Sequence, residues 1–437
     1  MEDKNNIGEQ KIEVNNQVRL QKGIPDLFKR KINFKQTFSA LKFPNYKLWF
    51  IGQIISLFGT WMQITAEGFL VFELTHSPLY LGYVGFASGI PAWLFMFYGG
   101  IISDRYSRRT ILILTQTMMM LLALILAALT FFGVVQAWHI ILLAFFLGLA
   151  NAFDAPARQS FLLEIVDKEN VINAIALNST MFNSARVFGP VAAGIIYAAF
   201  GPAWCFALNG LSFFGVITAL VKMKINPIIN TELKKSIFAE LKEGIKYSVT
   251  HPMIRNLIVL VSAINLFGIS FVTLIPDWAV KILHGDATTN GVLQSARGIG
   301  ALLTALMIAS LSSSKYIYRL LTIGIFSFPI SLIVFAVFHQ MAITLIALFW
   351  TGVGIILIFN LTNGIIQNLV RDEFRGRVMS FYSFTSFGFQ PIGALIIGII
   401  AEHFGESNSV FICAIITIIF SLITWNSMRK VESLNVL

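Results

Sequence analysis

Residues 99–110 read GGIISDRYSRRT and form a short charged segment between two long apolar runs. The segment carries one aspartate and three arginines, namely Asp104, Arg105, Arg108 and Arg109. On each side lie about twenty uncharged residues, which is enough for a helix to cross a bilayer. Because loops rich in arginine stay on the cytoplasmic side of a membrane, we expect this segment to face the cytoplasm. Its two glycines allow another backbone to approach closely.

The composition predicts an integral membrane protein. The 437 residues are 56% hydrophobic and 12% charged, whereas a soluble domain has about 25% charged residues. The mean hydropathy is +0.74, and the chain has room for roughly twelve spanning helices. The net charge of +10 comes from residues that lie between apolar runs, so it indicates membrane orientation and does not favour nucleic-acid binding. Cys205 and Cys413 both fall inside apolar runs and read as buried thiols.

Twelve apolar runs divide into two sets of six. The predicted spans are 48–74, 79–102, 110–133, 139–156, 171–199 and 203–222, then 254–283, 288–312, 317–338, 341–366, 377–402 and 409–428. The predicted organisation is a polar tail (1–42), a first half (43–222), a linker (223–253), a second half (254–428) and a short tail (429–437). The tail is either a basic interfacial helix over about 28–41 or a disordered segment. Its polarity argues against a cleavable signal peptide.

The basic residues set the expected orientation. With both termini in the cytoplasm, Lys281 is the only one of the 32 Lys and Arg residues that lands outside, while Arg186 and Arg297 fall within spans. The opposite orientation would place nearly all of this charge across the membrane.

The two halves repeat in sequence. At an offset of 204 residues, Phe161–Ala174 aligns with Ile365–Val378 without a gap. The same offset pairs three glycines and one dipeptide: Gly148 with Gly352, Gly189 with Gly393, Gly194 with Gly398, and Phe200-Gly201 with Phe404-Gly405. Parallel halves of six helices predict a pseudo-two-fold axis along the membrane normal. The counterpart of the charged segment, at 312–319, keeps positive charge and lacks the aspartate, so Asp104 belongs to one half only.

A Gly-Pro pair lies in the fifth predicted span. Proline in mid-helix removes a hydrogen bond and bends the helix, so Gly189 and Pro190 predict a bend. Small residues from here to Gly194 allow a neighbouring helix to pack closely. A purely structural role is the alternative.

Three motifs carry a family resemblance. The charged segment matches the pattern G-x-L-x-D-R-x-x-R-R at Gly100 and its four charged residues, with Ile102 in place of leucine. Residues 184–194 resemble the helix 5 pattern G-P-x-x-G-G, with Ala193 in place of one glycine. Together with residues 151–166 and 375–380, these motifs resemble the transmembrane secretion effector group of the major facilitator superfamily over about residues 43–428.

The resemblance implies an all-α fold of twelve membrane helices in two pseudo-symmetric halves. It implies alternating access in a bacterial plasma (inner) membrane, with a small molecule bound between the halves near the bilayer midplane. It further implies export of a siderophore or an amphipathic drug by proton antiport. The family often has glutamine where this chain has Glu67, so a coupling site at this position is either inherited or rebuilt here.

Charges within the spans are candidates for coupling and cargo binding, because an ion in the bilayer core costs at least about 2.5–3.5 kcal/mol. Helices 1 and 5 are neighbours in the family, so Glu67 and Arg186 are predicted to face the central cavity and to interact. Glu67 then either neutralises Arg186 or carries the proton; reaching the outer surface is its alternative. Arg297 either pairs with Asp277 or joins Arg186 in a cationic cavity for an anion with carboxylates or catechols. Asp277 can also be a solvated helix end.

Polar residues at membrane depth include Gln63, Asn183 and Gln390. Hydrogen bonds between helices are their ordinary role, and we expect some of them to line the cavity. Gln390 aligns with Arg186 at the 204-residue offset.

The charged segment is predicted to be a conformational latch. We expect Asp104 to meet Arg158 after helix 4, or the start of helix 11 near Arg375 and Arg377, when the cavity opens outward. The latch would set the conformational balance without touching cargo.

Enzyme chemistry is not expected. The six histidines show no metal-ligand spacing, and no P-loop is present, so we expect no metal, no cofactor and no ATP drive. The predicted partners are a small-molecule substrate, protons and the lipid bilayer, and we expect a monomer. The alternatives are a proton-coupled uptake symporter and a membrane sensor that keeps the fold without transport.

Overall fold

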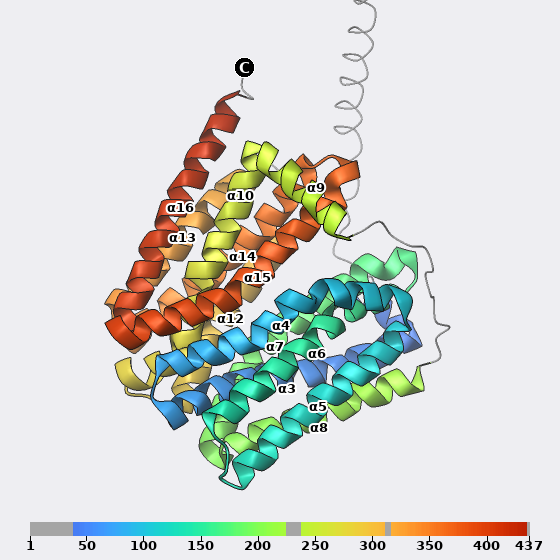
Figure 1. Ribbon diagram of the computed structural model, residues 1–437, viewed down its shortest axis with the longest axis vertical. Coiled ribbons are helices and arrows are strands. Elements are labelled where there is room, and N and C mark those ends of the chain that lie inside the picture. The colour runs from blue at the N-terminus through green and yellow to red at the C-terminus, as the bar shows by residue number, and fades with distance from the viewer. Residues whose placement is uncertain (1–37, 224–236, 311–315, 435–437) are drawn as a thin grey trace, which may run out of the picture.

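The structure is a computed structural model that describes residues 38–223, 237–310 and 316–434. The predictions for the tail before residue 38, for linker residues 224–236 and for residues 312–315 lie outside this part of the chain. A short 3-10 helix, η1 (Ser39–Lys42), precedes six long helices (Figure 1). They are α3 (Pro44–Thr75), α4 (Pro78–Arg105), α5 (Arg108–Phe131), α6 (Ala137–Leu162), α7 (Val171–Phe200) and α8 (Pro202–Lys222); a short turn, η2 (Lys168–Asn170), precedes α7.

The second set of helices follows α9 (Ile237–Thr250), the helical part of the linker. It comprises α12 (Ala287–Ser310), α13 (Ile317–Val337), α14 (Met341–Leu369), α15 (Asp372–Phe404) and α16 (Glu406–Leu434), preceded by one irregular span, Pro252–Ile282. This span consists of α10 (Pro252–Ala263), π-helical η3 (Ile264–Gly268), 3-10 helical η4 (Ile269–Leu274), α11 (Ile275–Asp277) and π-helical η5 (Trp278–Ile282). Pro276 lies inside this irregular stretch, where its missing N–H leaves no donor for a regular turn. Each predicted apolar run lies on one of these spans, but the sequence does not predict the irregular turns of the seventh span.

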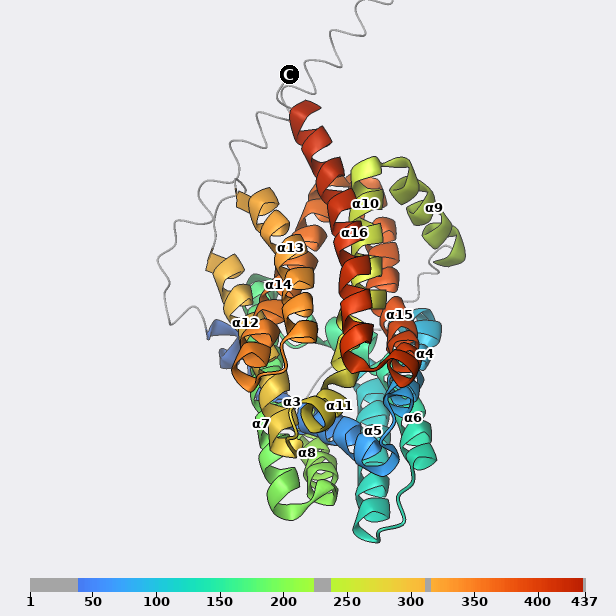
Figure 2. The same ribbon diagram turned by 90° about the vertical axis from the view of Figure 1, so that its left-hand side faces the viewer.

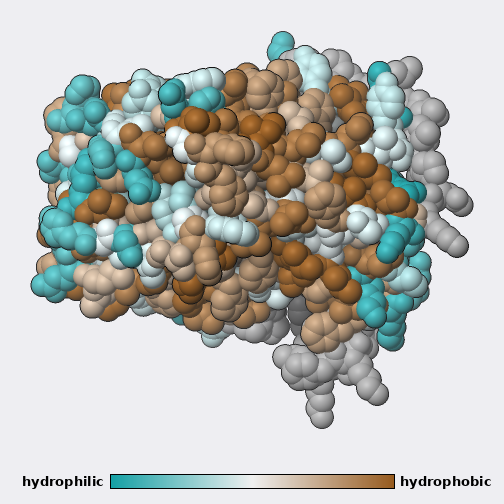
Figure 3. Space-filling view, turned by 90° about the horizontal axis from the view of Figure 1, so that it is seen from below, coloured by the Kyte–Doolittle hydropathy of each residue, from teal (hydrophilic) through white to brown (hydrophobic). Residues whose placement is uncertain are grey.

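The helices have the lengths and surfaces of membrane spans. Ten described helical segments are long and apolar enough to cross a bilayer, and α4, bent by 54° between Phe95 and Tyr98, is an eleventh. The 30-residue α7 completes twelve by its length and its place in the bundle. Large apolar side chains such as Leu114, Phe188 and Ile346 are exposed. Figure 3 shows an apolar belt between two hydrophilic ends. The predicted all-helical membrane fold is confirmed.

Two groups of six spans make up the bundle. Helices α3–α8 pack against one another, as do α10–α16, and the groups meet along two helix pairs, α4 with α15 and α7 with α12 (Figure 2). We call the end of the bundle at which α3 begins and α8 ends the linker end, and the opposite end the distal end.

The repeat is visible in the packing of the registered glycines. A side-chain carbon at Gly189 of α7 would lie 2.6 Å from Trp61 Cβ on the first span of its half, and Gly393 of α15 likewise meets Leu266 on the first span of the other half. Gly201 and Gly405 end the fifth span of each half with φ of 89° and 79°, a conformation that glycine adopts without strain.

Contacts between the halves run from the distal end to about mid-span, where Trp93 of α4 stacks on Phe384 of α15. At the distal ends, a side-chain carbon at Gly194 would lie 2.8 Å from the Ala287 carbonyl oxygen, and one at Gly398 would lie 2.9 Å from that of Pro78. At the linker end, Gly100 and Gly376 have no neighbouring atom within 4 Å of such a carbon. The two halves are therefore closed together at the distal end and apart at the linker end.

Candidate functional site

The charged segment fastens helices within its own half. Arg108 forms an ion pair with Glu164 at the end of α6 and lies 3.9 Å from Asp104. Arg109 donates two hydrogen bonds of 2.7 Å to carbonyl oxygens at the C-terminal end of α8, at Leu220 and Val221. A guanidinium at a helix C-terminus meets carbonyls that have no partner within the helix. The segment thus ties the start of α5 to α6 and α8.

Its two glycines have different surroundings. Gly99 lies against the backbone of Ala152 in α6, so close that a side chain would not fit. Gly100, the glycine of the family motif, faces open space. The predicted close approach therefore occurs at Gly99 in this arrangement.

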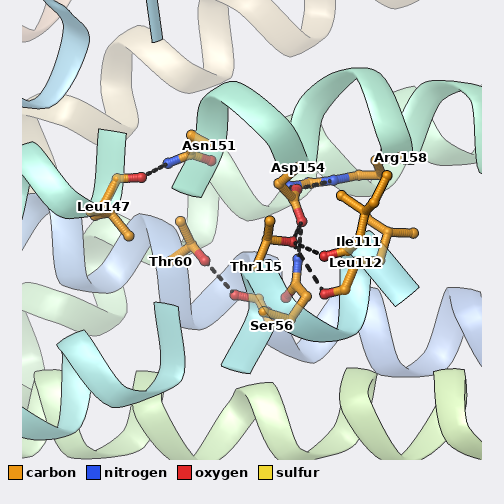
Figure 4. Close-up of polar contacts among 10 residues, drawn as sticks. Ser56, Thr60, Ile111, Leu112, Thr115, Leu147, Asn151, Asp154 and Arg158 are labelled. Carbon is orange, nitrogen blue, oxygen red and sulfur yellow. Dashed lines mark hydrogen bonds and ion pairs between the residues drawn. The ribbon is translucent and has the colours of Figure 1, made fainter. Parts of the chain in front are cut away.

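Arg158 binds an acid that the sequence reading did not single out. It forms an ion pair with Asp154 one turn earlier on α6 (Figure 4). Asp154 is fully buried and also accepts hydrogen bonds from Thr115 Oγ1 at 2.9 Å and Gln116 Nε2 at 2.8 Å, both on α5. The i, i+4 spacing of Asp154 and Arg158 was the available signal. No ion pair between Arg158 and Asp104 is present among the described residues.

The basic residues at the start of α15 also have partners on their own side. Arg375 pairs with Asp372 at 2.5 Å, and Arg377 pairs at 2.5 Å with Glu243 of α9. Because the halves are apart at the linker end, the predicted latch is not assembled in this arrangement. It remains a prediction for the opposite state.

The small residues of α7 pack closely against the other half. Pro190 lies inside α7, and its carbonyl oxygen abuts Gly291 of α12. Together with Gly194, this stretch brings the backbones of α7 and α12 together, as the sequence predicts; the bend at Gly189 stays a prediction.

Glu67 does not pair with Arg186. Its side chain is buried and accepts a hydrogen bond of 3.5 Å from Gln63 Nε2, while Gln63 Oε1 accepts one of 2.7 Å from Asn209 of α8. Arg186 instead lies over the ring of Trp61, 5.7 Å from its centroid. Trp61 and Glu67 are six positions apart, which places them about 120° apart around a helix of 3.6 residues per turn. Among the described residues, no cation forms an ion pair with Glu67.

The arginines from the two halves do come together. Arg186 of α7 and Arg297 of α12 lie on the stretches of these two helices that pack against each other across the interface between the halves. The backbone between them is tightly packed: Ser295 Oγ donates a 2.7 Å hydrogen bond to the Val187 carbonyl oxygen, and a side-chain carbon at Gly298 would lie 2.9 Å from the Arg186 carbonyl oxygen. Both lie near the middle of their helices. Of the two alternatives for Arg297, pairing with Asp277 is wrong.

Neither arginine has a counter-ion among the residues that the structure describes. Within the described part of the chain, neither guanidinium forms an ion pair or a hydrogen bond, and the Nε atom of each is buried without an acceptor. Arg297 is 5% exposed and Arg186 is half-buried.

Neither of the two remaining polar candidates, Asn183 and Gln390, hydrogen-bonds to Arg186 or Arg297 among the described residues. Asn183 is half-buried and donates to the Ser179 carbonyl oxygen at 2.8 Å within α7. Gln390 is exposed on α15, next to Pro391, which packs against Gly89 of α4.

A second charged group lies at the distal end. Lys281 binds Asp277 at 3.2 Å and Glu406 of α16 at 2.8 Å, and its ammonium lies 5.3 Å from the ring centroid of Phe72 in the other half. Asp277 is fully buried, so the expectation of a solvated helix end is wrong. The i, i+4 spacing from Asp277 to Lys281 was a signal, but nothing local to the sequence pointed to Glu406.

This architecture defines a class of protein, a multi-pass membrane transporter with unpaired charge between two halves. Among solved structures, the nucleoside transporter NupG superposes with a TM-score of 0.69 at 13% identity, over 88% of this chain and 99% of that one. At this identity, the likeness shows the fold alone.

The family follows from the sequence. A family model described as transmembrane secretion effector matches residues 35–436, and the chain belongs to this family. It is similar to the Staphyloferrin A transporter of Staphylococcus aureus (strain NCTC 8325 / PS 47), with 26% identity over 88% of this chain and 97% of the relative. It is also similar to Macrolide efflux protein A of Streptococcus pyogenes, with 20% identity over 90% of this chain and 99% of the relative, and to the Enterobactin exporter EntS of Shigella flexneri, with 23% identity over 62% and 64%. The chain is a transporter of small molecules and not an enzyme.

Proposed function

We propose that this protein exports a small organic molecule, a siderophore or an amphipathic drug, in exchange for protons. Two of the similar proteins are named for siderophores and one for macrolide efflux. The observation that carries the proposal is that the two halves are closed together at one end and apart at the other. Ionisable groups, Glu67, Arg186 and Arg297, lie within the spans of both halves.

The linker end is proposed to face the cytoplasm of a bacterial cell. The arginines of the charged segment, Arg158 and Arg377 all lie at this end, in agreement with the positive-inside bias. Both termini would then be cytoplasmic, the membrane would be the inner membrane, and the present arrangement would be inward-facing. Export requires the distal contacts to break while the linker end closes.

Glu67 is the proposed proton carrier. It is buried in a span with a neutral hydrogen-bond partner, Gln63, and no cation bound to it among the described residues. An ionised carboxylate in the bilayer core costs at least about 2.5–3.5 kcal/mol, so such a group holds a proton when enclosed and releases it when water reaches it. The chain of amides from Gln63 to Asn209 links this carboxyl to α8 and positions it.

The test uses energised everted vesicles, whose acidic lumen corresponds to the cell exterior. Staphyloferrin A, enterobactin and erythromycin serve as probes, and a pH-sensitive dye reports the lumen. Proton antiport predicts that one of the probes accumulates in the lumen while protons leave it. The Glu67→Gln variant should lose both signals, whereas Glu373→Gln, which changes an exposed acid at the start of α15, should keep them.

The same assay separates the alternatives. Accumulation that occurs only in right-side-out vesicles would support an uptake symporter. No flux of any probe in either orientation would contradict transport of these cargoes and favour a sensor.

A further inference from the structure

We infer that the cargo is a small organic anion with two or more oxyanion groups, and that Arg186 and Arg297 bind it together, one arginine from each half. This inference rests on the proposed transport function and names the substrate class of its central site.

The first step concerns the free-energy cost of placing the guanidinium groups of Arg186 and Arg297 within the membrane. Each arginine lies within a membrane span, where charged side chains face a cavity or a partner. Lys281 at the distal end, by contrast, binds two carboxylates. The arginines at the linker end also have partners: Arg108, Arg158, Arg375 and Arg377 each pair with an acid. Within the described helices, Arg186 and Arg297 thus carry charge in the spans without the carboxylate partner that each of these five basic residues has.

The second step is that the two charges are held together. The Ser295–Val187 hydrogen bond joins α12 to α7. Because Gly291 and Gly298 have no side chains, the two backbones can approach closely. Without this packing the two guanidinium groups could separate. Like charges brought together without an anion destabilise the protein, and a bound anion removes that penalty.

The third step is the geometry of the ligand. A guanidinium presents a planar fork of N–H donors that fits carboxylate and similar oxyanions in a bidentate manner. The buried Nε atoms of both arginines have no acceptor, so each fork has an unused donor. Two guanidinium groups, one on each half, fit a molecule with at least two such oxyanion groups. Such a molecule would bridge the two halves. The Trp61 ring beside Arg186 offers an apolar surface for the body of the cargo.

The experiment measures binding without a proton gradient. The melting temperature of the purified protein is followed against citrate, with its trimethyl ester as an uncharged probe of the same skeleton and sodium chloride as an ionic-strength control. We expect saturable stabilisation by citrate alone. Arg186→Gln and Arg297→Gln should each weaken it at least tenfold, and Arg186→Lys should retain part of it. Arg429→Gln removes an arginine that also stacks on a tryptophan, Trp425, but at the exposed end of α16, and should leave citrate binding unchanged.

A charge reversal tests the pair without relying on a probe. Arg297→Glu would give Arg186 a counter-ion, so it should raise the melting temperature of the ligand-free protein and abolish the citrate response. A lower melting temperature in this variant, or equal stabilisation by citrate and its ester, would overturn the inference.

The outcomes distinguish this inference from the proposed function. Citrate binding that depends on both arginines, without proton-driven flux in vesicles, would leave the anion site standing and contradict proton antiport. Proton-driven flux of erythromycin that is unchanged in both arginine variants, with no citrate binding, would leave export standing and contradict the anion site.

Discussion

Glu402 of α15 caps a helix of the opposite half. Its carboxylate Oε2 accepts a 2.6 Å hydrogen bond from Ser77 Oγ and a 3.4 Å hydrogen bond from the backbone N–H of Leu79, in the first turn of α4. This contact exists only while the distal end is closed. Replacing the carboxylate should therefore shift the protein toward the state in which the distal end is open.

The magnitude follows from the kind of contact. A hydrogen bond to a charged group contributes about 1.5–3 kcal/mol and a helix cap about 1 kcal/mol. Glu402 is exposed, and solvent weakens both effects. A loss of about 1–2 kcal/mol for Glu402→Ala corresponds to a shift of roughly 5–30-fold in the ratio of the two states.

Distances between spin labels measure this ratio. One pair of labels, at Tyr80 and Phe411, reports the distal end, and another, at Tyr106 and Leu369, reports the linker end; all four side chains are exposed. The two native cysteines, Cys205 and Cys413, are replaced by alanine first. In the Glu402→Ala variant we expect the distal pair to move apart and the linker-end pair to move together.

The control is Glu373→Gln, which changes an exposed acid at the other end of the same helix. It should leave both distance distributions unchanged. If Glu402→Ala also leaves them unchanged, or moves the distal labels closer, then this carboxylate does not hold the closed state and the reasoning is refuted.

Three further predictions concern the stability of the first half, the distal contact between the halves and the charged segment. Asp154→Asn removes the buried charge that pairs with Arg158. It should lower the free energy of unfolding by about 3–5 kcal/mol, measurable as a lower denaturation midpoint, and a change below 1 kcal/mol would contradict a stabilising role for this buried ion pair. Gly194→Val places a side chain where Thr288 lies and should open the distal end in the spin-label assay; distal labels as close as in the wild type would show that this contact does not limit closure. Gly100→Val meets open space here and should keep this state stable, yet slow transport if the charged segment closes against the other half; unchanged turnover would contradict the latch.

The sequence predicts the spans and the repeat well, because both depend on the length of apolar runs and the spacing of glycines along the chain. An apolar run of membrane length has few alternatives to a spanning helix. The registered glycines proved to make equivalent contacts in the two halves, since close helix packing requires a small residue at a fixed depth. The π and 3-10 turns of η3 and η4, by contrast, have no recognisable sequence pattern.

The side-chain pairs were harder to predict. In a membrane the lipid is as apolar as the protein core, so hydropathy does not reveal which way a spanning helix faces. The sequence therefore predicts that Glu67 meets Arg186, whereas Arg186 of α7 lies against Trp61, about 120° around α3 from Glu67. The sequence pairs Arg186 with Arg297 only because both are charges within spans, whereas in the structure the packing of α7 on α12 places their backbones next to each other.

The most direct test of proton-coupled export compares two assays of the same reconstituted protein. With an imposed proton gradient and a siderophore probe, wild-type protein should accumulate the probe against its concentration gradient, and Glu67→Gln should not. At equal pH on both sides, both proteins should exchange labelled for unlabelled probe at similar rates, because exchange needs the cargo site and not the proton. Accumulation by the Glu67→Gln variant that matches the wild type would contradict the role of Glu67, and a wild-type protein that exchanges the probe but never accumulates it would contradict proton-coupled export.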